Sequence, residues 1–398
     1  MTKLADRTKL IKPSVTLAIA AKAGKLRAEG IDVVNFSAGE PDFDTPEPIK
    51  DAAREALRTG MTKYTDVKGI EPLREAIAEK YQREHDLVYR KEDVIVSCGA
   101  KHSLYNVLQA VVNPGDEVLI PAPYWVSYSD MALLAGGVPK LISSSEAGGF
   151  RITPEQLRAA LTPLTRVFLL NSPCNPTGAT YNREELLAIA AILEKHDCLV
   201  LADDIYEKII YDGFQVHNIV TLCPALRDRT IIVNGVSKTY AMTGWRIGYA
   251  LGPGDIIAAA GKIQSQSTSN PTSIAQAAAV QAIRGPQDEV AIMVREFLRR
   301  RDVIVDKLNA VDGICCRKPE GAFYVFPNIS KLFGRSGNGK KLNSPCDVAD
   351  YFLEEAKVAG VPGEDFGSNE HIRFSYATSL EDIEKGCARI RQAVAKLC

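Results

Sequence analysis

The residues that could carry chemistry in this chain stand at the carboxyl ends of apolar, strand-like segments. Lys238 follows one such segment, Thr230–Val233, within the run Asn234-Gly235-Val236-Ser237-Lys238. In a pocket with little water a lysine's ammonium form is destabilised, so its neutral amine becomes a nucleophile for a carbonyl compound. A lysine taken alone is most often a solvated surface residue. The interpretation of Lys238 therefore depends on the residues that accompany it.

Two further charged residues occupy comparable positions. Asp203 follows the apolar segment Cys198–Ala202, and a buried carboxylate there needs a partner such as a protonated ring nitrogen. Asp203 could instead cap a helix, although its neighbour Asp204 offers a second carboxylate for that purpose. Arg246 stands shortly after Lys238 and carries a fork of donors suited to phosphate. The whole constellation, more than any one member, favours a functional site.

Two loops add polar groups to this set. The loop Asn171–Gly178 contains two prolines and a glycine, which fix a tight turn and hold the amide of Asn175 in place. Its alternative interpretation is an Asx turn between prolines. The run Cys98-Gly99-Ala100-Lys101 joins a strand to a helix, where small residues let backbone N–H groups approach an anion. A glycine at such a turn is more often structural, so this second signal is weak by itself.

These side chains need a scaffold that brings distant strand ends together. Apolar strands are predicted at 94–97, 117–120, 166–170, 198–202, 230–233 and 247–251, with helices such as 101–112 and 183–196 between them. Such alternation predicts an α/β fold with a mostly parallel sheet, one antiparallel strand possible, covered on both faces. Ligands of such sheets bind at the carboxyl ends of the strands. We therefore expect the residues described above to converge there.

The C-terminal part has a different pattern. Alanine-rich helices are predicted at 274–283 and 290–308, then strands at 321–326 and 371–376, a helix at 348–359 and a polar loop at 334–344. This mixture predicts a smaller α+β domain. We expect residues 1–45 to form an N-terminal arm and part of the small domain, 46–290 the large domain, and 291–398 the rest of the small domain.

The composition disfavours several other classes of protein. Lysine and arginine (48) nearly balance aspartate and glutamate (49), so the basic surface of a nucleic-acid-binding protein is not expected. No apolar run approaches the ~18 residues that cross a membrane. The nine cysteines and five histidines are scattered without a CxxC pair, so we expect no metal site and free thiols in a reducing cytoplasm. A cytoplasmic enzyme acting on small molecules is the resulting expectation.

Taken in order along the chain, these residues resemble the class I aminotransferases, enzymes of fold-type I that depend on pyridoxal 5′-phosphate (PLP). The resemblance covers nearly the whole chain. Its motifs are Lys12-Pro13-Ser14, Ser37-Ala38-Gly39-Glu40-Pro41-Asp42-Phe43, Tyr64, Pro123-Tyr124-Trp125, Asn175-Pro176-Thr177-Gly178, Asp203 with Tyr206, Ser237-Lys238, Arg246, and Ile372-Arg373-Phe374-Ser375-Tyr376-Ala377.

The resemblance implies how the PLP ring is held. Lys238 would form a Schiff base with PLP and later move a proton as general base and acid. Asp203 would pair with the ring nitrogen, which keeps the ring an electron sink. Tyr206 and Asn175 would hydrogen-bond the ring hydroxyl oxygen, and Trp125 would stack on the ring.

The phosphate of PLP would be bound by backbone near Gly99, Ala100 and Lys101, and by Arg246. Many relatives place a phosphate-binding serine three residues before the lysine. That position is Gly235 here, while Ser237 is next to Lys238, so a role of Ser237 in binding phosphate is an open question. The resemblance also implies a homodimer in which Tyr64 reaches the phosphate of the neighbouring subunit.

For the substrate, the resemblance implies that Arg373 clamps the α-carboxylate, helped by Asn175, Trp125 and the backbone of Gly39. The N-terminal motifs resemble the bacterial and plant Iβ subgroup of aspartate aminotransferases, several of which accept prephenate. In that subgroup Lys101, Lys12 and Thr16 would receive the distal carboxylate. A cation is needed for that purpose, because burying an unpaired second carboxylate is prohibitive.

We therefore expect ping-pong transamination between an L-amino acid, with aspartate favoured and a glutamate/prephenate pair possible, and a 2-oxo acid such as 2-oxoglutarate. An aromatic or broad-specificity aminotransferase is the alternative within this chemistry. Another fold-type I enzyme, such as a β-lyase or racemase, is a second alternative. A cofactor-binding regulatory module is a third, and few residues before Lys12 are available for its DNA-binding segment.

Overall fold

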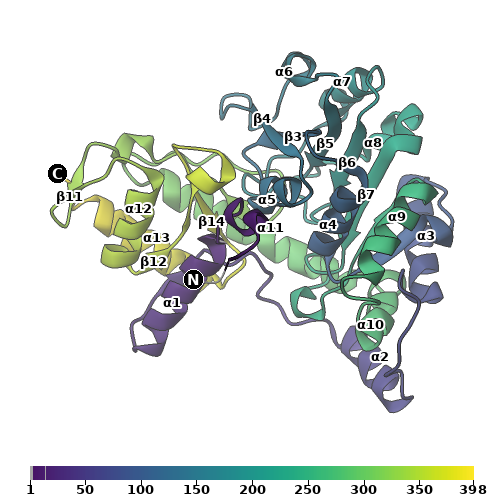
Figure 1. The fold of residues 1–398 in the computed structure, drawn as a ribbon. Helices are drawn as coiled ribbons and strands as arrows, with labels where there is room; N and C mark the ends of the chain where they lie inside the picture. The colour runs from purple at the N-terminus through teal and green to yellow at the C-terminus, as the bar shows by residue number, and fades with distance from the viewer. Residues whose placement is uncertain (1–2, 14) are drawn as a thin grey trace.

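The structure is a computed structural model that describes residues 3–13 and 15–398. It has a larger lobe built on a seven-stranded sheet and a smaller lobe to which both N-terminal and C-terminal segments of the chain contribute (Figure 1). The strands of the large sheet, in spatial order, are β2 (Val94–Ser97), β8 (Gly248–Leu251), β7 (Thr230–Gly235), β6 (Leu199–Asp203), β5 (Thr165–Asn171), β3 (Glu117–Ala122) and β4 (Val138–Ser143).

Strand β8 alone runs against the other six strands of this sheet. It pairs antiparallel with both β2 and β7, whereas β7, β6, β5, β3 and β4 pair in parallel. Gly248, the first residue of β8, lies opposite Ser97 and Gly235, the last residues of its two neighbours. The reversal therefore brings the segment that precedes β8 to the edge where the other strands end. The predicted mostly parallel α/β sheet is confirmed.

Two apolar cores cover the two faces of the sheet, because alternate residues of each strand point to opposite sides. Val118 and Ile120 of β3 belong to one core and Leu119 belongs to the other. The first core is closed by α4 (Ala100–Val111), α5 (Ser127–Leu134) and α9 (Gly254–Ser265). The second contains α3 (Glu71–His85), α6 (Pro154–Ala160), α7 (Arg183–Leu193), α8 (Ile219–Leu222) and α10 (Ser273–Arg284), and α2 (Glu47–Arg58) packs against α10.

The smaller lobe has short strands and peripheral helices. Its strands are β9 (Tyr324–Val325), β14 (Ile372–Ser375) and β13 (Val361–Pro362) in one antiparallel sheet, β1 (Val34–Asn35) parallel to β12 (Val358–Ala359), and the hairpin of β10 (Ser336–Gly337) and β11 (Lys340–Lys341). Its helices are α1 (Val15–Ala28), α12 (Pro345–Tyr351) and α13 (Leu380–Val394), while the long α11 (Asp288–Asn309) extends from this lobe toward the larger one (Figure 1). Because β1 pairs with β12, the N-terminal segment packs with C-terminal residues.

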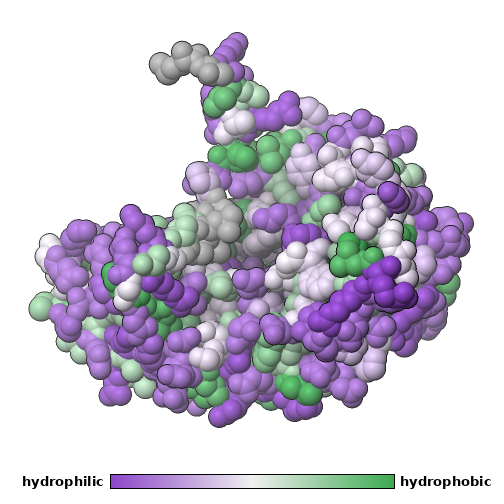
Figure 2. All heavy atoms as spheres, turned by 90° about the horizontal axis from the view of Figure 1, so that it is seen from below, coloured by the Kyte–Doolittle hydropathy of each residue, from purple (hydrophilic) through white to green (hydrophobic). Residues whose placement is uncertain are grey.

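Short helical turns complete the chain. The 3₁₀ turns are Asp6–Lys9, Lys91–Asp93, Pro224–Arg229, Thr243–Trp245, Ser330–Leu332 and Gly363–Phe366, and Phe352–Ala356 forms a π turn. Within the described part of the chain, no helix combines the length and the apolar character that a membrane crossing needs. On the face shown in Figure 2 hydrophilic side chains predominate, and apolar ones form small separate groups.

Several elements differ from the sequence-based prediction. The helix expected at 348–359 is formed by α12 and the π turn Phe352–Ala356 that continues it, so it ends at Ala356. The chain then turns through Lys357 (φ 54°) into β12, because pairing with β1 overrides local helical preference. Strand β4 was not expected, since it is an edge strand with several exposed residues and no continuous apolar run. The polar loop at 334–344 contains the β10–β11 hairpin. The limits of the two domains stay a prediction.

Candidate active site

A cavity of about 470 Å³ lies at the edge of the large sheet where the parallel strands end. Most of the residues singled out from the sequence line it. The lining residues are Asn35, Ser37, Ala38, Gly39, Glu40, Ala100, Lys101, Leu104, Trp125, Val126, Ser127, Tyr128, Asn171, Asn175, Asp203, Ile205, Tyr206, Ser237, Lys238, Thr243, Arg246, Tyr324 and Arg373. Its size is in the range of small-molecule sites.

Lys238 projects into this cavity from the segment that follows β7. Its Nζ donates a hydrogen bond of 2.5 Å to the backbone oxygen of Gly39. Loss of solvation on burial lowers the pKa of Lys238 to about 8, helped by repulsion from Arg373 and Arg246 and opposed by Glu40. An amine with this pKa is partly neutral near physiological pH, which a nucleophilic lysine requires.

Asp203, the last residue of β6, is buried deep in the same cavity. Its Oδ2 accepts a 2.6 Å hydrogen bond from the hydroxyl of Tyr128, and its Oδ1 accepts one of 3.3 Å from the backbone N–H of Ile205. Burial raises the pKa of Asp203 to about 6, although both hydrogen bonds act to lower it. Among the described residues, Asp203 forms no ion pair. The carboxylate is therefore suited to a cationic group that enters the cavity.

The start of α4 forms an anion cradle together with Arg246. Gly99 has φ +89°, and a Cβ built on it would collide with the Arg246 guanidinium. A Cβ on Gly248 would overlap the backbone nitrogen of Ala100, so β8 and α4 approach each other at a point that only glycine permits. The first N–H groups of a helix have no acceptor within the helix, and its dipole favours negative charge there.

Arg246 is held at this cradle by its own backbone. Its φ of +57° is uncommon for a residue with a side chain, and its Nη1 donates to the oxygen of Thr243 at 2.8 Å. Its Nη2 lies 3.4 Å from the oxygen of Cys98. Gly235 faces Gly248 across the sheet, where a Cβ would lie only 3.0 Å from the neighbouring Cα. Close approach of β7 and β8 thus explains the glycine, while Ser237 lines the cavity.

On another wall, buried hydroxyl and amide groups face the cavity. The hydroxyls of Tyr206 and Tyr324 lie 2.9 Å apart. Asn175 donates its backbone N–H to Asn171 Oδ1 at 3.1 Å, which fixes the proline-rich loop after β5. Its Oδ1 accepts from Arg373, so its Nδ2 is left to donate to another group.

Arg373 reaches the cavity from β14 of the smaller lobe. Its Nη1 donates to Asn175 Oδ1 and its Nη2 to the backbone oxygen of Ser37, both at 2.9 Å. The guanidinium lies over the rings of Tyr324 and Phe366, at 4.6 and 5.0 Å from their centroids. Its buried Nε has no hydrogen-bond partner among the described residues. Burial lowers the pKa of Arg373 without neutralising it, so the site retains an uncompensated positive charge.

Lys101 supplies a second cation at the same cavity. Its Nζ lies 4.7 Å from the centroid of the Trp125 ring. Partial burial and repulsion from Arg246 lower the pKa of Lys101. Among the described residues, Lys101 forms no ion pair.

Of the predicted site residues that the structure describes in full, Gly99, Tyr64 and Lys12 do not line the cavity, although Gly99 directly precedes the lining residue Ala100. Tyr64 is 91% exposed. Lys12 is exposed, and its charge acts on Asp130 and Asp365. Thr16 belongs to α1, but its side chain lies outside the described residues. Their predicted roles stay predictions.

Sequence reasoning missed three residues that line the cavity. Tyr128 stands three residues after Trp125, where the first turn of α5 begins past the end of β3. Tyr324 lies in β9, which was recognised only as a strand. Glu40 accepts a 2.7 Å hydrogen bond from Thr243. Two signals were available: Tyr128 lies shortly after a strand end, and Glu40 lies within the motif Ser37–Phe43.

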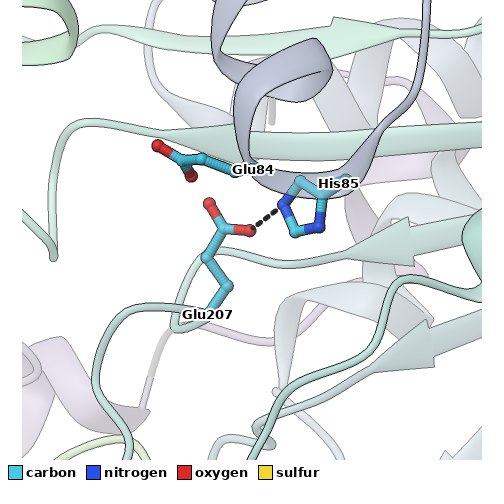
Figure 3. Close-up of side chains that lie close together, drawn as sticks. All are labelled: Glu84, His85 and Glu207. Atoms are coloured by element: carbon cyan, nitrogen blue, oxygen red, sulfur yellow. Dashed lines mark hydrogen bonds and ion pairs between the residues drawn. The ribbon is translucent and has the colours of Figure 1, made fainter.

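Glu84, His85 and Glu207, which do not line the cavity, lie close enough to one another to hold a metal ion, with ligand atoms within 4.8 Å (Figure 3). The ammonium groups of two lysines already pair with these carboxylates. Lys80 Nζ lies 2.5 Å from Glu207 and 2.9 Å from Glu84, and Lys208 Nζ lies 2.8 Å from Glu84. We therefore describe the cluster as a buried ion-pair network.

A model of the family described as aminotransferase class I and II matches residues 31–390. The chain belongs to this family. This aminotransferase is 51% identical to the aspartate/prephenate aminotransferase of Cereibacter sphaeroides, with 100% of each chain covered. It superposes on the crystal structure of the aspartate aminotransferase of Rhizobium meliloti with a TM-score of 0.97, at 47% identity and 100% coverage of both chains. The Thermus thermophilus aspartate aminotransferase with maleate gives a TM-score of 0.93 at 42% identity, covering 99% of this chain and 100% of that one.

Membership makes this aminotransferase a PLP-dependent enzyme. The cavity fits that cofactor in three respects. The cradle at Gly99 and Arg246 suits a phosphate, the buried Asp203 carboxylate suits a protonated ring nitrogen, and the Lys238 amine suits an aldehyde.

Proposed function

We propose that this aminotransferase transfers the amino group between L-aspartate and a 2-oxo acid such as 2-oxoglutarate. The observation that carries the proposal is that two cations, Lys101 and Arg373, line one cavity and neither forms an ion pair among the described residues. A dicarboxylic amino acid brings two carboxylates, one for each cation. An amino acid with an apolar side chain would leave Lys101 without a partner.

The names of similar enzymes support this substrate class. Relatives from Cereibacter sphaeroides and Geobacillus stearothermophilus are named aspartate/prephenate aminotransferase and aspartate aminotransferase, at 51% and 49% identity. The Thermus thermophilus enzyme was solved with maleate, which is a dicarboxylate. These names do not favour the aromatic alternative, and they leave prephenate as a second partner to be tested.

PLP would be held by residues at or after the ends of five strands, β2, β3, β5, β6 and β7, together with Arg246. Lys238 would bind it covalently through Nζ, Asp203 would face the ring nitrogen, and Trp125 would cover the ring. Tyr206 and the free Nδ2 of Asn175 would donate to the ring hydroxyl oxygen. Backbone N–H groups of Gly99, Ala100 and Lys101, with Arg246 and Ser237, would bind the phosphate.

When bound, PLP supplies an electron sink that makes the proton on the substrate Cα removable. Lys238 Nζ takes that proton as general base and delivers it as general acid, as its pKa of about 8 permits. Arg373 fixes the α-carboxylate, with Asn175 and the Gly39 backbone beside it, which orients the Cα–H bond toward Lys238. One site serves donor and acceptor in turn, so we expect ping-pong kinetics.

We also propose that the enzyme acts as a homodimer in which Tyr64 reaches the phosphate of the neighbouring subunit. The exposure of this tyrosine supports the proposal, because 91% of a large aromatic side chain is open to solvent. Lys12 and Thr16 are proposed to complete the distal carboxylate site, with Lys101 as its main cation. Sedimentation of the holoenzyme, alone and as Tyr64→Ala, tests the dimer separately from the substrate.

A panel of amino donors with 2-oxoglutarate tests the substrate proposal. We expect aspartate turnover with glutamate formed in stoichiometric amount, which also separates transfer from elimination or racemisation. Lys101→Ala should lower kcat/KM for aspartate about 100-fold, as expected for a lost charge-assisted bond, and spare phenylalanine. Lys262→Ala, an exposed lysine of α9, is the matched control. Unchanged aspartate turnover in Lys101→Ala would refute the dicarboxylate assignment.

A further inference from the structure

Tyr128 is bonded to Asp203 by the shortest hydrogen bond that this carboxylate makes. The hydroxyl of Tyr128 donates to Asp203 Oδ2 at 2.6 Å, between residues that are 1% and 3% exposed. The other oxygen, Oδ1, receives the backbone N–H of Ile205 at 3.3 Å. Both residues line the cavity, so the bond lies at its wall.

The same tyrosine contacts the aromatic side chain that is expected to cover the PLP ring. The rings of Tyr128 and Trp125 meet edge to face, with centroids 5.3 Å apart and an interplanar angle of 88°. Tyr128 is thus fixed by Trp125 on one side and, on the other, by the apolar core between α5 and the sheet. A donor held so firmly has little freedom to leave its acceptor.

Asp203 needs such a donor for two physical reasons. Rotation of a carboxylate about its last side-chain bond is broad, so hydrogen bonds must select the orientation that presents an oxygen to the cavity. A buried carboxylate without an ion pair is also costly in its charged form. Two donors, Tyr128 and the Ile205 backbone, compensate part of that cost.

We propose that Tyr128 is a positioning residue that keeps Asp203 ionised and aimed at the ring nitrogen of PLP. The inference rests on the proposed pairing of Asp203 with that nitrogen. Tyr128 acts through Asp203 and contacts neither the Cα proton nor the substrate carboxylates.

The direction of the titration shifts agrees with this geometry. Burial raises the pKa of Asp203 to about 6, while the Tyr128 hydrogen bond and the charge of Lys238 act to lower it. Burial and the neighbouring carboxylate raise the pKa of Tyr128 well above its usual value, so the phenol keeps its proton and remains a donor. Without this donor the pKa of Asp203 rises further, so more of the carboxyl group is protonated. A protonated Asp203 no longer attracts a positive ring nitrogen.

The test is Tyr128→Phe, which removes one oxygen and keeps the ring against Trp125. Holoenzyme reconstituted with PLP labelled with ¹⁵N in the ring reports protonation of that nitrogen by NMR, independently of turnover. We expect the protonated fraction at pH 8 to fall, PLP to dissociate about tenfold more readily and kcat to fall about tenfold, as for a lost hydrogen bond to a charged group. KM for aspartate should stay within about twofold, because Arg373 and Lys101 are untouched.

Tyr181→Phe is the matched control. Tyr181 is also buried, and its hydroxyl accepts the N–H of Ile152 at 3.1 Å. Its variant should keep the nitrogen signal and kcat of the parent enzyme. A loss of thermal stability shared by both variants is the structural part of the effect, whereas the nitrogen signal and kcat should change in Tyr128→Phe alone.

A double-mutant cycle with Asp203→Asn separates the role of Tyr128 from that of Asp203. We expect Asp203→Asn alone to reduce nitrogen protonation and kcat, and Tyr128→Phe to add nothing in that background. The inference about Tyr128 is overturned if Tyr128→Phe leaves the nitrogen signal unchanged, or costs the same factor in both backgrounds. If Asp203→Asn itself changes neither quantity, the proposed role of Asp203 fails first, and the role of Tyr128 fails with it.

Discussion

Arg373 Nη1 donates a buried hydrogen bond of 2.9 Å to Asn175 Oδ1, across 198 positions of sequence. Arg373 belongs to β14 of the smaller lobe, and Asn175 follows β5 of the large sheet. The proposed site for the α-carboxylate is therefore assembled from both lobes. Any change in how the lobes pack should alter substrate binding before it alters the proton chemistry at Lys238.

Arg373→Lys should weaken every amino donor alike, because all of them share the α-carboxylate. Lysine keeps the charge but lacks the planar fork that binds a carboxylate with two parallel bonds. We expect kcat/KM to fall about 100-fold for aspartate and for phenylalanine, mostly through KM, by the loss of a charge-assisted bond in a buried site. Steady-state kinetics with both donors measures the fall in kcat/KM, and Arg389→Lys, in an ion pair with Asp32, is the control. A loss confined to aspartate would contradict the α-carboxylate assignment.

The capture of PLP by the apoprotein should depend on pH through Lys238. Burial lowers the pKa of this lysine to about 8, from an ordinary 10.5. The neutral amine is the reactive form, so the capture rate should rise with pH and level off above about 9, dropping about tenfold per unit well below the pKa. Absorbance after rapid mixing of apoprotein and PLP follows the reaction. A rate that climbs steadily to pH 10.5 would indicate an ordinary, solvated lysine.

Gly248→Ala should loosen the anion cradle. Its methyl group would overlap the backbone nitrogen of Ala100 and push the first turn of α4 away from β8. We expect a stability loss of about 1–3 kcal/mol, typical of overpacking, and weaker PLP binding. Thermal unfolding of the apoprotein and titration with PLP measure the two effects separately. Gly24→Ala in α1, where a Cβ meets nothing within 4 Å, should show neither loss.

Glu207→Gln should reveal how much the buried ion-pair network contributes to the free energy of unfolding. Glu207 accepts from Lys80, His85 and Asn234, and removing its charge leaves Lys80 buried without its closest partner. Breaking a buried pair in this way costs about 3–5 kcal/mol. Chemical denaturation at pH 7 measures the loss, whereas Glu55→Gln in an exposed pair should hardly change the midpoint.

The same network predicts a direction for the effect of acid. Burial raises the pKa of Glu207, but attraction to Lys80 and His85 outweighs it and brings the pKa well below its ordinary 4.5. A depressed folded-state pKa contributes stability that is complete above the unfolded value and is lost as pH falls below it. The parent protein should therefore lose stability between pH 4.5 and more acidic values. The Glu207→Gln variant should not show the part of this acid-induced loss of stability that comes from Glu207. If both proteins lose stability equally with falling pH, the loss comes from other carboxyl groups.

Much of the scaffold was predictable because its elements have strong local patterns. Strand β2 begins and ends where the apolar run Val94–Ser97 predicted, and helix α4 differs from its predicted range by one residue at each end. Lys238, Asp203 and Asn175 were found because they stand at or shortly after the ends of buried strands, and parallel strands bring their carboxyl ends to one edge. The edge strand β4 was not predicted, since its exposed residues form no continuous apolar run.

The sequence by itself determined which residue types stand at the strand ends, and so the class of chemistry. Only the tertiary structure decided which of them meet. An apolar run marks a buried strand but not its direction, and the reversal of β8 is what brings Arg246 beside Gly99. The bond from Tyr128 to Asp203 likewise depends on how α5 packs on the sheet, 75 positions away in sequence. Strand direction and helix packing arise from contacts between distant segments, which no local pattern of residues encodes.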